Sequence, residues 1–272
     1  TFGSQVTVVE ILPQILPLED EELTAELARL YRRKGMRLLT GSRVEGVAVD
    51  AGRGCTVRVS SGEEVEEIAC DLVLVAVGVA GNVEGIGLEE AGVEVEKGFI
   101  KVRPDYATTA QGIRAIGDCI GPPLLAHAAS REAALAVEAL LGHQVQPLDP
   151  DLVPGCTYCQ PQLARVGLTE AQARQAGREI TVGRFPFRPL GKALANGEPE
   201  GMVKAVVDKE DGKILGVHIL GAEAVELIPE ATLAMTLEAG AVSLESTVHP
   251  HPSLSEAVME AAAAALGRAI HI

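Results

Sequence analysis

The sequence predicts an α/β arrangement for residues 1–147 and an α+β arrangement for residues 148–272. In the first part, short β-branched runs alternate with helical patterns, and one unbroken apolar run is typical of a buried parallel strand. The second part follows a proline-bearing linker at 147–154 and combines three strand patterns with helical ones. Such a unit is typical of a sheet covered by helices on one face.

The composition is that of a globular protein with a strongly acidic balance. The 272 residues are 47% hydrophobic and carry a formal net charge of −15, with three Tyr, four Phe and no Trp. We expect no nucleic-acid partner, because such partners require clustered Lys and Arg and the sequence has no basic stripe. Since no apolar run reaches the ~18 residues of a membrane span, we expect a soluble, cytoplasmic protein without a membrane partner.

The first strand pattern, QVTVVE at 5–10, ends on an acid. The second strand of a dinucleotide-binding unit ends in this way, and its acid, here Glu10, would bind the adenosine ribose. A solvated strand end is the alternative interpretation. The glycine-rich loop of such a unit lies about 20 residues before the acid, yet nine residues precede Glu10 and no G-x-G-x-x-G occurs downstream. We therefore expect a partial Rossmann-like segment and the C-terminal part of a longer protein.

A helix, a series of strands and a second helix complete the first part. Periodicity and Gly35 place an amphipathic helix at about 19–34. The strands are expected near 36–40, 44–50, 55–60, 64–69, 71–78 (the apolar run DLVLVAVG) and 99–102. The second helix is expected from about 125 to 141, after a Pro-Pro break.

Residues 108–142 contain the most specific pattern of the first part. A short strand, Ile113 to Ile116, is expected to end in Gly117-Asp118. Ligands of open α/β sheets bind beyond the carboxyl ends of strands. Gly117 permits close backbone approach and Asp118 can accept a hydrogen bond from a sugar-type hydroxyl. An ordinary Asp-containing turn is the alternative.

The second part is predicted as a sheet with helices. The expected elements are a helix at 169–177 opened by Thr169 with Gln172, strands near 180–186, 201–208 and 213–220, and a helix at 223–239. Asp211-Gly212 between the last two strands is a hairpin turn signal.

The stretch VHPHPSLSEAVMEAAAAALG, 248–267, allows two interpretations. Ser253 and Glu256 fit a capping box at the start of a final helix, in which case His249 and His251 are loop residues. Alternatively, His251 and Glu256 form a proton-transfer pair at that helix start, because histidine titrates near working pH and a carboxylate can orient it.

The five cysteines are odd in number and irregularly spaced, so a disulfide framework is not expected. Cys156-Thr-Tyr-Cys159 has the C-x-x-C spacing of redox and zinc sites. A structural zinc site needs four ligands, and no second pair is present, so we expect no metal. The role of this pair stays open.

Three segments carry a resemblance to a known family: TTAQGIRAIGDC, FPFRPLGKALANGEPEGMVKAVVDKEDGKILGVHILG and HPHPSLSEA. In this order and spacing they resemble the flavin-dependent disulfide reductases, most closely the dihydrolipoamide dehydrogenases. The resemblance covers essentially the whole chain. It implies that residues 1–82 are the back part of an NAD-binding domain, 83–147 a returning segment of an FAD-binding domain, and 148–272 an interface domain for dimerisation.

The resemblance also implies roles for individual residues. His251 would be the active-site base and Glu256 would orient it, the pair facing the flavin and disulfide of a partner subunit. Glu10 and Gly78 would contact NAD. The implied FAD contacts are Gly117, Asp118, Leu125, Ala126 and His127, the last through its backbone.

The implied reaction is the oxidation of dihydrolipoamide by NAD⁺ through an enzyme disulfide and FAD. The implied partners are a second copy of the chain and the lipoyl-bearing acyltransferase of a 2-oxoacid dehydrogenase complex, or the lipoyl protein of glycine cleavage.

The sequence departs from the family pattern in two places. The family's C-x-x-x-x-C motif does not occur here, so the chain alone is expected to be inactive, and Cys159-Gln160-Pro161 stands where Thr-His-Pro is usual.

Two kinds of alternative are weighed. A glutathione reductase would use NADP and call for arginines after the strand that ends at Glu10, whereas Ile11-Leu12-Pro13 follows. A mercuric reductase would carry vicinal cysteines at the C-terminus, which ends in GRAIHI. The alternative of a different class is a non-catalytic dimerisation module, which a flavin absorbance spectrum of the chain would distinguish.

Overall fold

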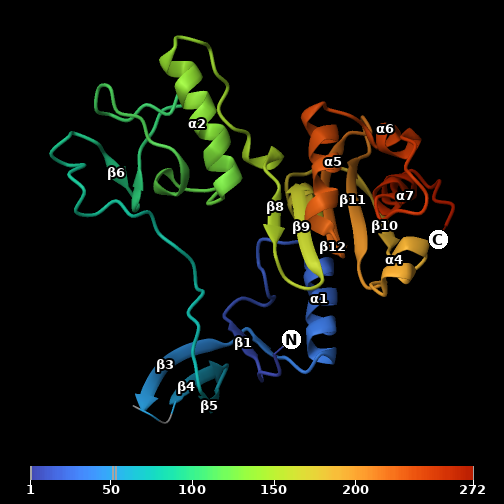
Figure 1. Cartoon of the computed structure of the whole chain (residues 1–272), viewed down its shortest axis with the longest axis horizontal. Helices are drawn as coiled ribbons and strands as arrows, with labels where there is room; N and C mark the ends of the chain where they lie inside the picture. The colour runs from blue at the N-terminus through green and yellow to red at the C-terminus, as the bar shows by residue number, and fades with distance from the viewer. Residues whose placement is uncertain (1, 51, 53, 272) are drawn as a thin grey trace. The chain divides into compact units, whose positions relative to one another are not determined.

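The computed structural model describes residues 2–50, 52 and 54–271, and it divides into two compact units. One unit joins Thr1–Val75 to Cys156–Ile272, and the other is Ala76–Gly155. Figure 1 draws both units and labels helices and strands where there is room. The predicted combination of α/β segments with an α+β domain is confirmed. Within the described residues, no helix is long and apolar enough to cross a membrane.

The first unit is built around a five-stranded sheet with the order β10-β11-β12-β9-β8. Its strands are β8 (Gly155–Thr157), β9 (Gln162–Gly167), β10 (Ile180–Pro186), β11 (Met202–Asp208) and β12 (Ile214–Gly221). The β10–β11, β11–β12 and β12–β9 pairs are antiparallel. The predicted hairpin turn at Asp211-Gly212 joins β11 to β12, and Gly212 has the positive φ of +75° that such a turn requires.

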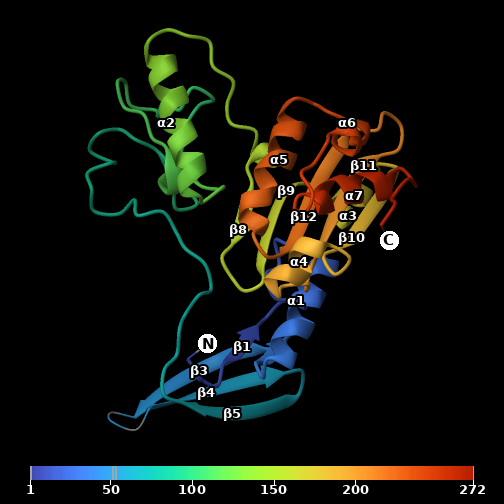
Figure 2. The ribbon, with the colours of Figure 1, turned by 45° about the vertical axis from the view of Figure 1, so that its right-hand side comes forward.

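Three helices cover one face of this sheet, as Figure 2 shows. They are α5 (Ala224–Thr236), α6 (Ala241–Ser246) and α7 (Glu256–Ala265). Phe185 of β10, Val203 of β11 and Ile219 of β12 are fully buried in the core beneath them. Two further helices, α3 (Glu170–Gln175) and α4 (Gly191–Asn196), precede and follow β10 along the chain, and the predicted capping box of Thr169 and Gln172 is present at the start of α3.

Helix α7 lies unusually close to β10 because small residues meet at their contact. A Cβ atom placed on Gly183 would lie 1.9 Å from the Ala261 carbonyl oxygen, a distance that no side chain tolerates. Ala257, Ala261 and Ala265 on the facing side of α7 are buried in the same core. The alanine-rich sequence of α7 therefore serves close packing as well as helix propensity.

The opposite face of the sheet has a covering layer that the sequence analysis did not predict. Helix α1 (Glu21–Arg33) buries Leu23, Leu27 and Leu30 against Leu163 of β9 and Leu220 of β12. The expectation of helices on one face only is therefore wrong for this sheet. The reason is that a helix far away in the sequence, predicted correctly as an amphipathic helix at 19–34, places its apolar stripe here.

A buried lysine fixes α1 to the sheet. The Lys204 side chain on β11 is 3% exposed, and its Nζ lies 2.9 Å from carboxylate oxygens of Asp20, Glu22 and Glu170. Asp20 also caps α1, because its Oδ1 accepts a hydrogen bond from the Glu22 amide. Burial disfavours the charged lysine, but the carboxylates outweigh this and raise the pKa of Lys204. Burial acts against ionisation of Glu170 as well, yet hydrogen bonds from Arg174 and Lys204 lower its pKa to about 2.

The remainder of the first unit consists of a two-stranded parallel sheet and an antiparallel meander. Strands β1 (Thr7–Glu10) and β2 (Arg37–Thr40) are parallel, as expected of a partial Rossmann-like segment. The meander consists of β3 (Arg43–Asp50), β4 (Gly54–Ser61) and β5 (Glu64–Cys70), which lie together in the lower left of Figure 2. These strands agree with the predicted ones to within about two residues.

The prediction of a buried strand at 71–78 is wrong. No strand is assigned there, and Leu72, Leu74 and Val77 are 81%, 84% and 93% exposed. An apolar run forms a strand only when a neighbouring strand takes up its backbone hydrogen bonds. Within the described residues, no strand pairs with this run.

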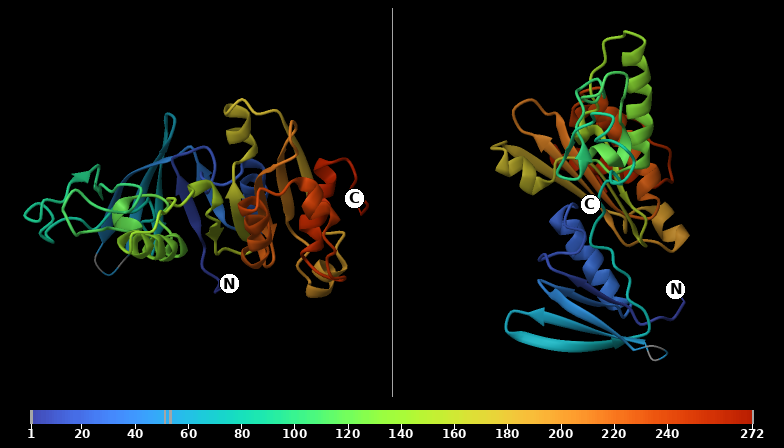
Figure 3. Two further views of the ribbon diagram at one scale, coloured as in Figure 1. Left: turned by 90° about the horizontal axis from the view of Figure 1, so that it is seen from above. Right: turned by 90° about the vertical axis from the view of Figure 1, so that its left-hand side faces the viewer.

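The second unit contains little regular structure besides one long helix, as the views in Figure 3 also indicate. Its elements are β6 (Val95–Glu96), β7 (Phe99–Ile100), η1 (Gly117–Ile120), α2 (Ala126–Leu140) and η2 (Pro150–Leu152). Helix α2 confirms the prediction for 125–141. The expected strand at 113–116 is absent, because the segment makes only an isolated bridge between Ala107 and Arg114.

The Lys204 cluster predicts a large loss of stability when the lysine is removed. We expect Lys204→Ala to lower the free energy of unfolding by about 3–5 kcal/mol, because Asp20 is left buried without its cation. Arg29→Ala is the control, since the Arg29–Glu26 pair is exposed and screened by solvent, so its loss should change stability little. Urea unfolding of both variants measures the difference, and equal losses would contradict a structural role for the buried cluster.

The close contact between α7 and β10 predicts that Gly183→Ala destabilises the chain by about 1–3 kcal/mol through overpacking. Gly191→Ala is the matched control, because no atom lies within 4 Å of a Cβ at that position. The control should be neutral or stabilising by about 0.4–1 kcal/mol. Thermal melts of the two variants test this, and an unchanged melting temperature for Gly183→Ala would show that α7 is not held at this distance.

Candidate active site

The segment between α6 and α7, 247–255, displays one histidine to solvent. The His251 side chain is 78% exposed, and its Nδ1 lies 2.8 Å from Glu256 Oε1. Among the described residues, its Nε2 has no hydrogen-bond partner. The ring is therefore anchored through one nitrogen and presents the other, which is the arrangement that a general base requires.

Glu256 stands in the first turn of α7 and uses its two carboxylate oxygens differently. Oε1 pairs with His251, while Oε2 accepts a hydrogen bond of 2.8 Å from the Ser253 amide. One side chain thus closes the backbone turn and orients the imidazole. The carboxylate is only 15% exposed, so both interactions are shielded from competing water.

The predicted capping box is only half formed. Glu256 makes the expected contact with the backbone of Ser253, but the Ser253 hydroxyl lies 3.0 Å from the Ser255 hydroxyl and caps no amide. Ser255 occupies the N-cap position without a side-chain hydrogen bond. The prediction of Ser253 as the N-cap is therefore wrong, because α7 begins two residues later than that cap would place it.

The ionisation of Glu256 follows from its surroundings. Burial disfavours the charged carboxylate, but hydrogen bonds from His251 and from the Ser253 amide outweigh burial and lower the pKa of Glu256. The carboxylate is therefore ionised at neutral pH and can stabilise a protonated imidazole beside it.

His249 is a structural anchor for this segment. Its side chain is 4% exposed, and both ring nitrogens are engaged, Nε2 with Glu230 Oε1 at 2.6 Å and Nδ1 with the Thr247 carbonyl at 2.8 Å. His249 lies in a loop, as the capping interpretation expected, and in addition fastens that loop to α5. Glu230 was missed altogether, and no local spacing could have found it, because it lies 19 residues away.

Glu10 and Gly78 belong to different compact units. Glu10 is the last residue of β1, and its Oε1 accepts a hydrogen bond of 2.9 Å from the Leu12 amide. One of its oxygens thus supports the local turn. Gly78 is exposed and has a φ of +122°, a conformation that only glycine adopts without strain.

Gly117 and Asp118 lie at the start of η1 in the second unit. Gly117 is buried with a φ of +73°, and its amide donates a hydrogen bond of 2.7 Å to Glu132 Oε2 of α2. Asp118 is exposed next to it. Glu132 is 5% exposed and was not singled out from the sequence, although a charged residue on the inner side of a helix was a possible signal.

The start of α2 carries the other predicted flavin contacts. Leu125 is the N-cap, with no side-chain hydrogen bond, and Ala126 and His127 are exposed in the first turn. His127 Nε2 lies 2.8 Å from the Pro154 carbonyl. The side chain of His127 therefore has a structural contact of its own, and the amides of the first turn stay open, as they do at any uncapped helix start.

Cys156 and Cys159 lack the character of a reactive pair. Burial raises the pKa of both thiols, and Cys159 Sγ donates a hydrogen bond of 3.0 Å to the Pro161 carbonyl. Thiols with a raised pKa are poor nucleophiles at neutral pH. In the part of the chain that the structure describes, no group of three or more His, Cys, Asp or Glu side chains could hold a metal ion.

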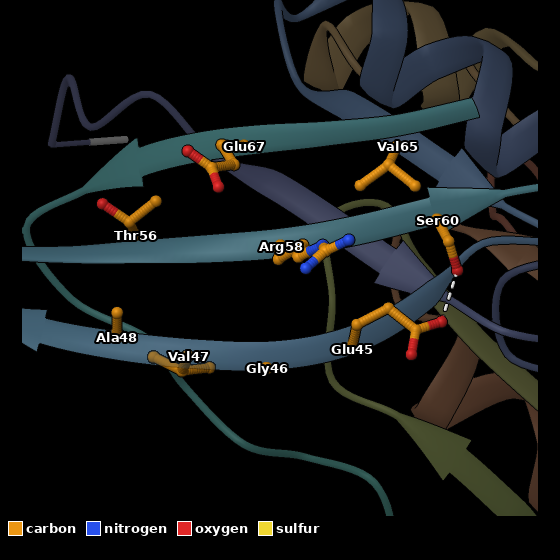
Figure 4. Close-up of a pocket in the computed structure, with 9 residues that line it drawn as sticks. All are labelled: Glu45, Gly46, Val47, Ala48, Thr56, Arg58, Ser60, Val65 and Glu67. Atoms are coloured by element: carbon orange, nitrogen blue, oxygen red, sulfur yellow. Dashed lines mark hydrogen bonds between the residues drawn. The ribbon is translucent and has the colours of Figure 1, made fainter.

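An open depression lies on one face of the meander, away from these residues in sequence, and Figure 4 shows its lining. It mixes apolar and charged side chains from β3, β4 and β5, namely Glu45, Gly46, Val47, Ala48, Thr56, Arg58, Ser60, Val65 and Glu67. Ser60 donates a hydrogen bond of 2.6 Å to Glu45. These groups lie spread along the sheet face instead of converging on one point, so we do not regard the depression as a catalytic site.

Two family models match the chain. The pyridine nucleotide-disulphide oxidoreductase model matches residues 1–133, and the model for the dimerisation domain of the same proteins matches residues 153–262. The chain belongs to the pyridine nucleotide-disulphide oxidoreductase family. The resemblance described from the sequence is thereby confirmed.

Curated relatives narrow the similarity within this family. Dihydrolipoyl dehydrogenases of Rhizobium etli and Thermus scotoductus are 44% and 45% identical over 272 and 273 residues, which cover 100% of this chain. The aligned regions are 56% and 59% of those relatives. The chain thus spans somewhat more than half the length of the curated relatives it matches.

Solved structures agree with this similarity. LpdA from Mycobacterium tuberculosis and the HOCl-induced flavoprotein disulfide reductase RclA from Escherichia coli each have a TM-score of 0.86 and 28% sequence identity. Both similarities cover 96% of this chain, and they cover 56% and 60% of the two neighbours.

The lowered pKa of Glu256 predicts how stability depends on pH. The ionised carboxylate favours the folded state above its ordinary pKa of 4.5, and this contribution is lost as the pH falls through the lowered folded-state pKa. We expect wild type to be more stable than Glu256→Gln at about pH 6 and this gap to narrow towards about pH 3. Urea unfolding across that range measures it, with exposed Glu238→Gln as the control, and a gap that does not change with pH would contradict the prediction.

Proposed function

We propose that this chain provides the active-site base and the dimerisation domain of an FAD-dependent dihydrolipoamide:NAD⁺ oxidoreductase. The single observation that supports it best is the anchored, exposed imidazole of His251 against the ionised Glu256. The identity of 44–45% to dihydrolipoyl dehydrogenases over the whole chain favours dihydrolipoamide over other dithiols.

The residues of the chain would act on protons. A dithiol attacks a disulfide only as the thiolate, so a base must remove its proton. His251 takes that proton on Nε2, because Nδ1 is engaged with Glu256. Glu256 fixes the tautomer and stabilises the imidazolium that forms. When bound, the flavin and nicotinamide supply the electron-transfer chemistry.

The residues proposed for the cofactors fit that use in part. Exposed Asp118 beside the buried turn at Gly117 has an acceptor for a flavin hydroxyl, and the uncapped start of α2 has open amides. Glu10 keeps one carboxylate oxygen for the NAD ribose, and Gly78 permits close approach of a ligand. We accordingly propose residues 1–82, 83–147 and 148–272 as the NAD, FAD and interface segments.

We further propose a homodimer that receives a lipoyl-bearing partner protein. The match of 153–262 to a dimerisation domain supports the dimer. The exposed apolar side chains of Leu233 on α5, of Leu237 directly after it and of Val242 on α6 suit a subunit interface. A base that is 78% exposed in one chain is also suited to a site that a second subunit completes.

The second candidate function is a non-catalytic dimerisation module. The lack of the C-x-x-x-x-C and G-x-G-x-x-G motifs in this sequence favours it.

The proposed base predicts a large and specific loss of activity. The part of the Thermus scotoductus relative that this chain does not match is fused to the chain, and turnover of dihydrolipoamide with NAD⁺ is measured after flavin loading. We expect His251→Gln to lower kcat by about 10²–10⁴-fold, because proton abstraction itself is lost. Glu256→Gln should cost less, since the imidazole is kept while its charged partner is lost.

His143→Gln is the control for this experiment, because this exposed histidine lies outside the proposed site. Melting temperatures of all variants separate catalytic from folding effects. Normal turnover by His251→Gln would sink the proposed role of the base. A fusion protein that binds no flavin, while the chain still dimerises in light scattering, would favour the non-catalytic module.

A further inference from the structure

Two cysteines of the meander lie directly opposite each other. Cys55 in β4 pairs with Cys70 in β5 across the antiparallel ladder. Residues paired in this way project to the same face of a sheet, since side chains alternate along both strands. The next pair on this face is Val57 with Ile68, and Val57 is 8% exposed. Both thiols are reduced and half-buried, so solutes retain access to them.

The backbone brings the two residues within the range of a disulfide. Opposed residues of an antiparallel pair have Cα atoms about 4.5 or about 5.5 Å apart, depending on the kind of pair. Disulfides span Cα separations of about 4.4–6.8 Å, so either kind of pair is compatible. The neighbouring backbone confirms the close approach, because a Cβ on Gly54 would lie 2.6 Å from the Cys70 carbonyl oxygen.

The position at the end of the ladder gives the pair room to adjust. β4 begins at Gly54, whose φ is +104°, and β5 ends at Cys70. Directly opposed Cβ atoms lie about 4.5–5.5 Å apart, and a disulfide needs about 3.5–4.5 Å, so a small inward movement is required. A strand end next to a glycine can make this movement more easily than the middle of a sheet can.

The other three cysteines are less suited to oxidation. Burial raises the pKa of the Cys156 and Cys159 thiols, which lowers their thiolate fraction at neutral pH. Cys159 donates its thiol hydrogen to the Pro161 carbonyl, and Cys119 donates to the Ile116 carbonyl at 3.2 Å. The C-x-x-C motif that the sequence singles out is therefore the poorer candidate, although its cysteines are closer in sequence.

We propose that Cys55 and Cys70 are a reversible oxidation site that joins β4 to β5 by a disulfide. With hydrogen peroxide as the oxidant, one thiol ionises and its thiolate attacks a peroxide oxygen, giving a sulfenic acid and a hydroxide that takes up the released proton to form one water. The second thiol then displaces the hydroxyl from the sulfenic sulfur, releasing a second water and closing the bond. The two thiols together lose two protons and two electrons, which reduce the peroxide to two waters, and a dithiol such as dithiothreitol reverses the oxidation. This site is independent of the proposed function, because it needs no flavin, substrate or partner.

Peptide mapping of the intact chain tests the proposal. The chain is treated with hydrogen peroxide, alkylated and digested with trypsin without reduction. Cys55 lies in the tryptic peptide 54–58 and Cys70 in 59–97, whereas Cys156 and Cys159 share the peptide 132–165. We expect a linked species of 54–58 with 59–97 that disappears after dithiothreitol, while Cys156 and Cys159 stay alkylated. Amide hydrogen exchange in β4 and β5 should also slow in the oxidised chain.

Matched variants keep the result unambiguous. Cys55→Ser and Cys70→Ser should each abolish the linked species, and the double variant Cys156→Ser with Cys159→Ser should form it as wild type does. Wild-type mapping alone decides the matter if a variant fails to fold. The proposal is overturned if peroxide leaves both peptides alkylated, oxidises each thiol to a sulfinic acid without linkage, or links Cys70 to a second copy of the chain instead.

Discussion

The carboxylate of Glu256 is the interaction on which the candidate site depends. Its two oxygens serve two different partners, the imidazole of His251 and the amide of Ser253, so the orientation of the ring follows from the start of α7. The segment before α7 is fastened at its other end by His249 and Glu230. The exposed imidazole is thus held through Nδ1 on a frame that is fastened at both ends, which is how an effective general base is presented.

That frame depends in turn on the sheet. Helix α7 approaches β10 as closely as it does because Gly183 has no side chain, and α1 is held to the other face by the buried ammonium of Lys204. Close packing therefore holds α7 on one face of the sheet, and an ion-pair cluster holds α1 on the other. The apolar face determines the position of the site, while the charged cluster joins a distant segment of the chain to the same sheet.

Much of this architecture was predictable from local patterns. The strands β10 to β12, the turn at Asp211-Gly212 and helices α1, α2 and α7 follow from periodicity, turn residues and helix signals, whereas strands β8 and β9 were not predicted. The contact between His251 and Glu256 was one of two interpretations of its segment, and the family resemblance favoured it. Contacts between distant residues were not predictable. Lys204 meets Asp20 across 184 residues, and Gly117 meets Glu132 across 15. The strand predicted from the apolar run at 71–78 is absent for the same reason, since a strand needs a partner strand that its own sequence does not specify.

The double role of Glu256 makes the length of its side chain as important as its charge. Aspartate would carry the same charge and tolerate a helix start equally well, yet it is one methylene shorter. From the same backbone position, we expect a carboxylate one methylene shorter to lose at least one of these contacts, because each partner lies at hydrogen-bond distance from a different oxygen of the longer side chain. Replacing Glu256 by aspartate would therefore keep the negative charge but not both contacts. The position requires the length of the glutamate side chain as well as its charge.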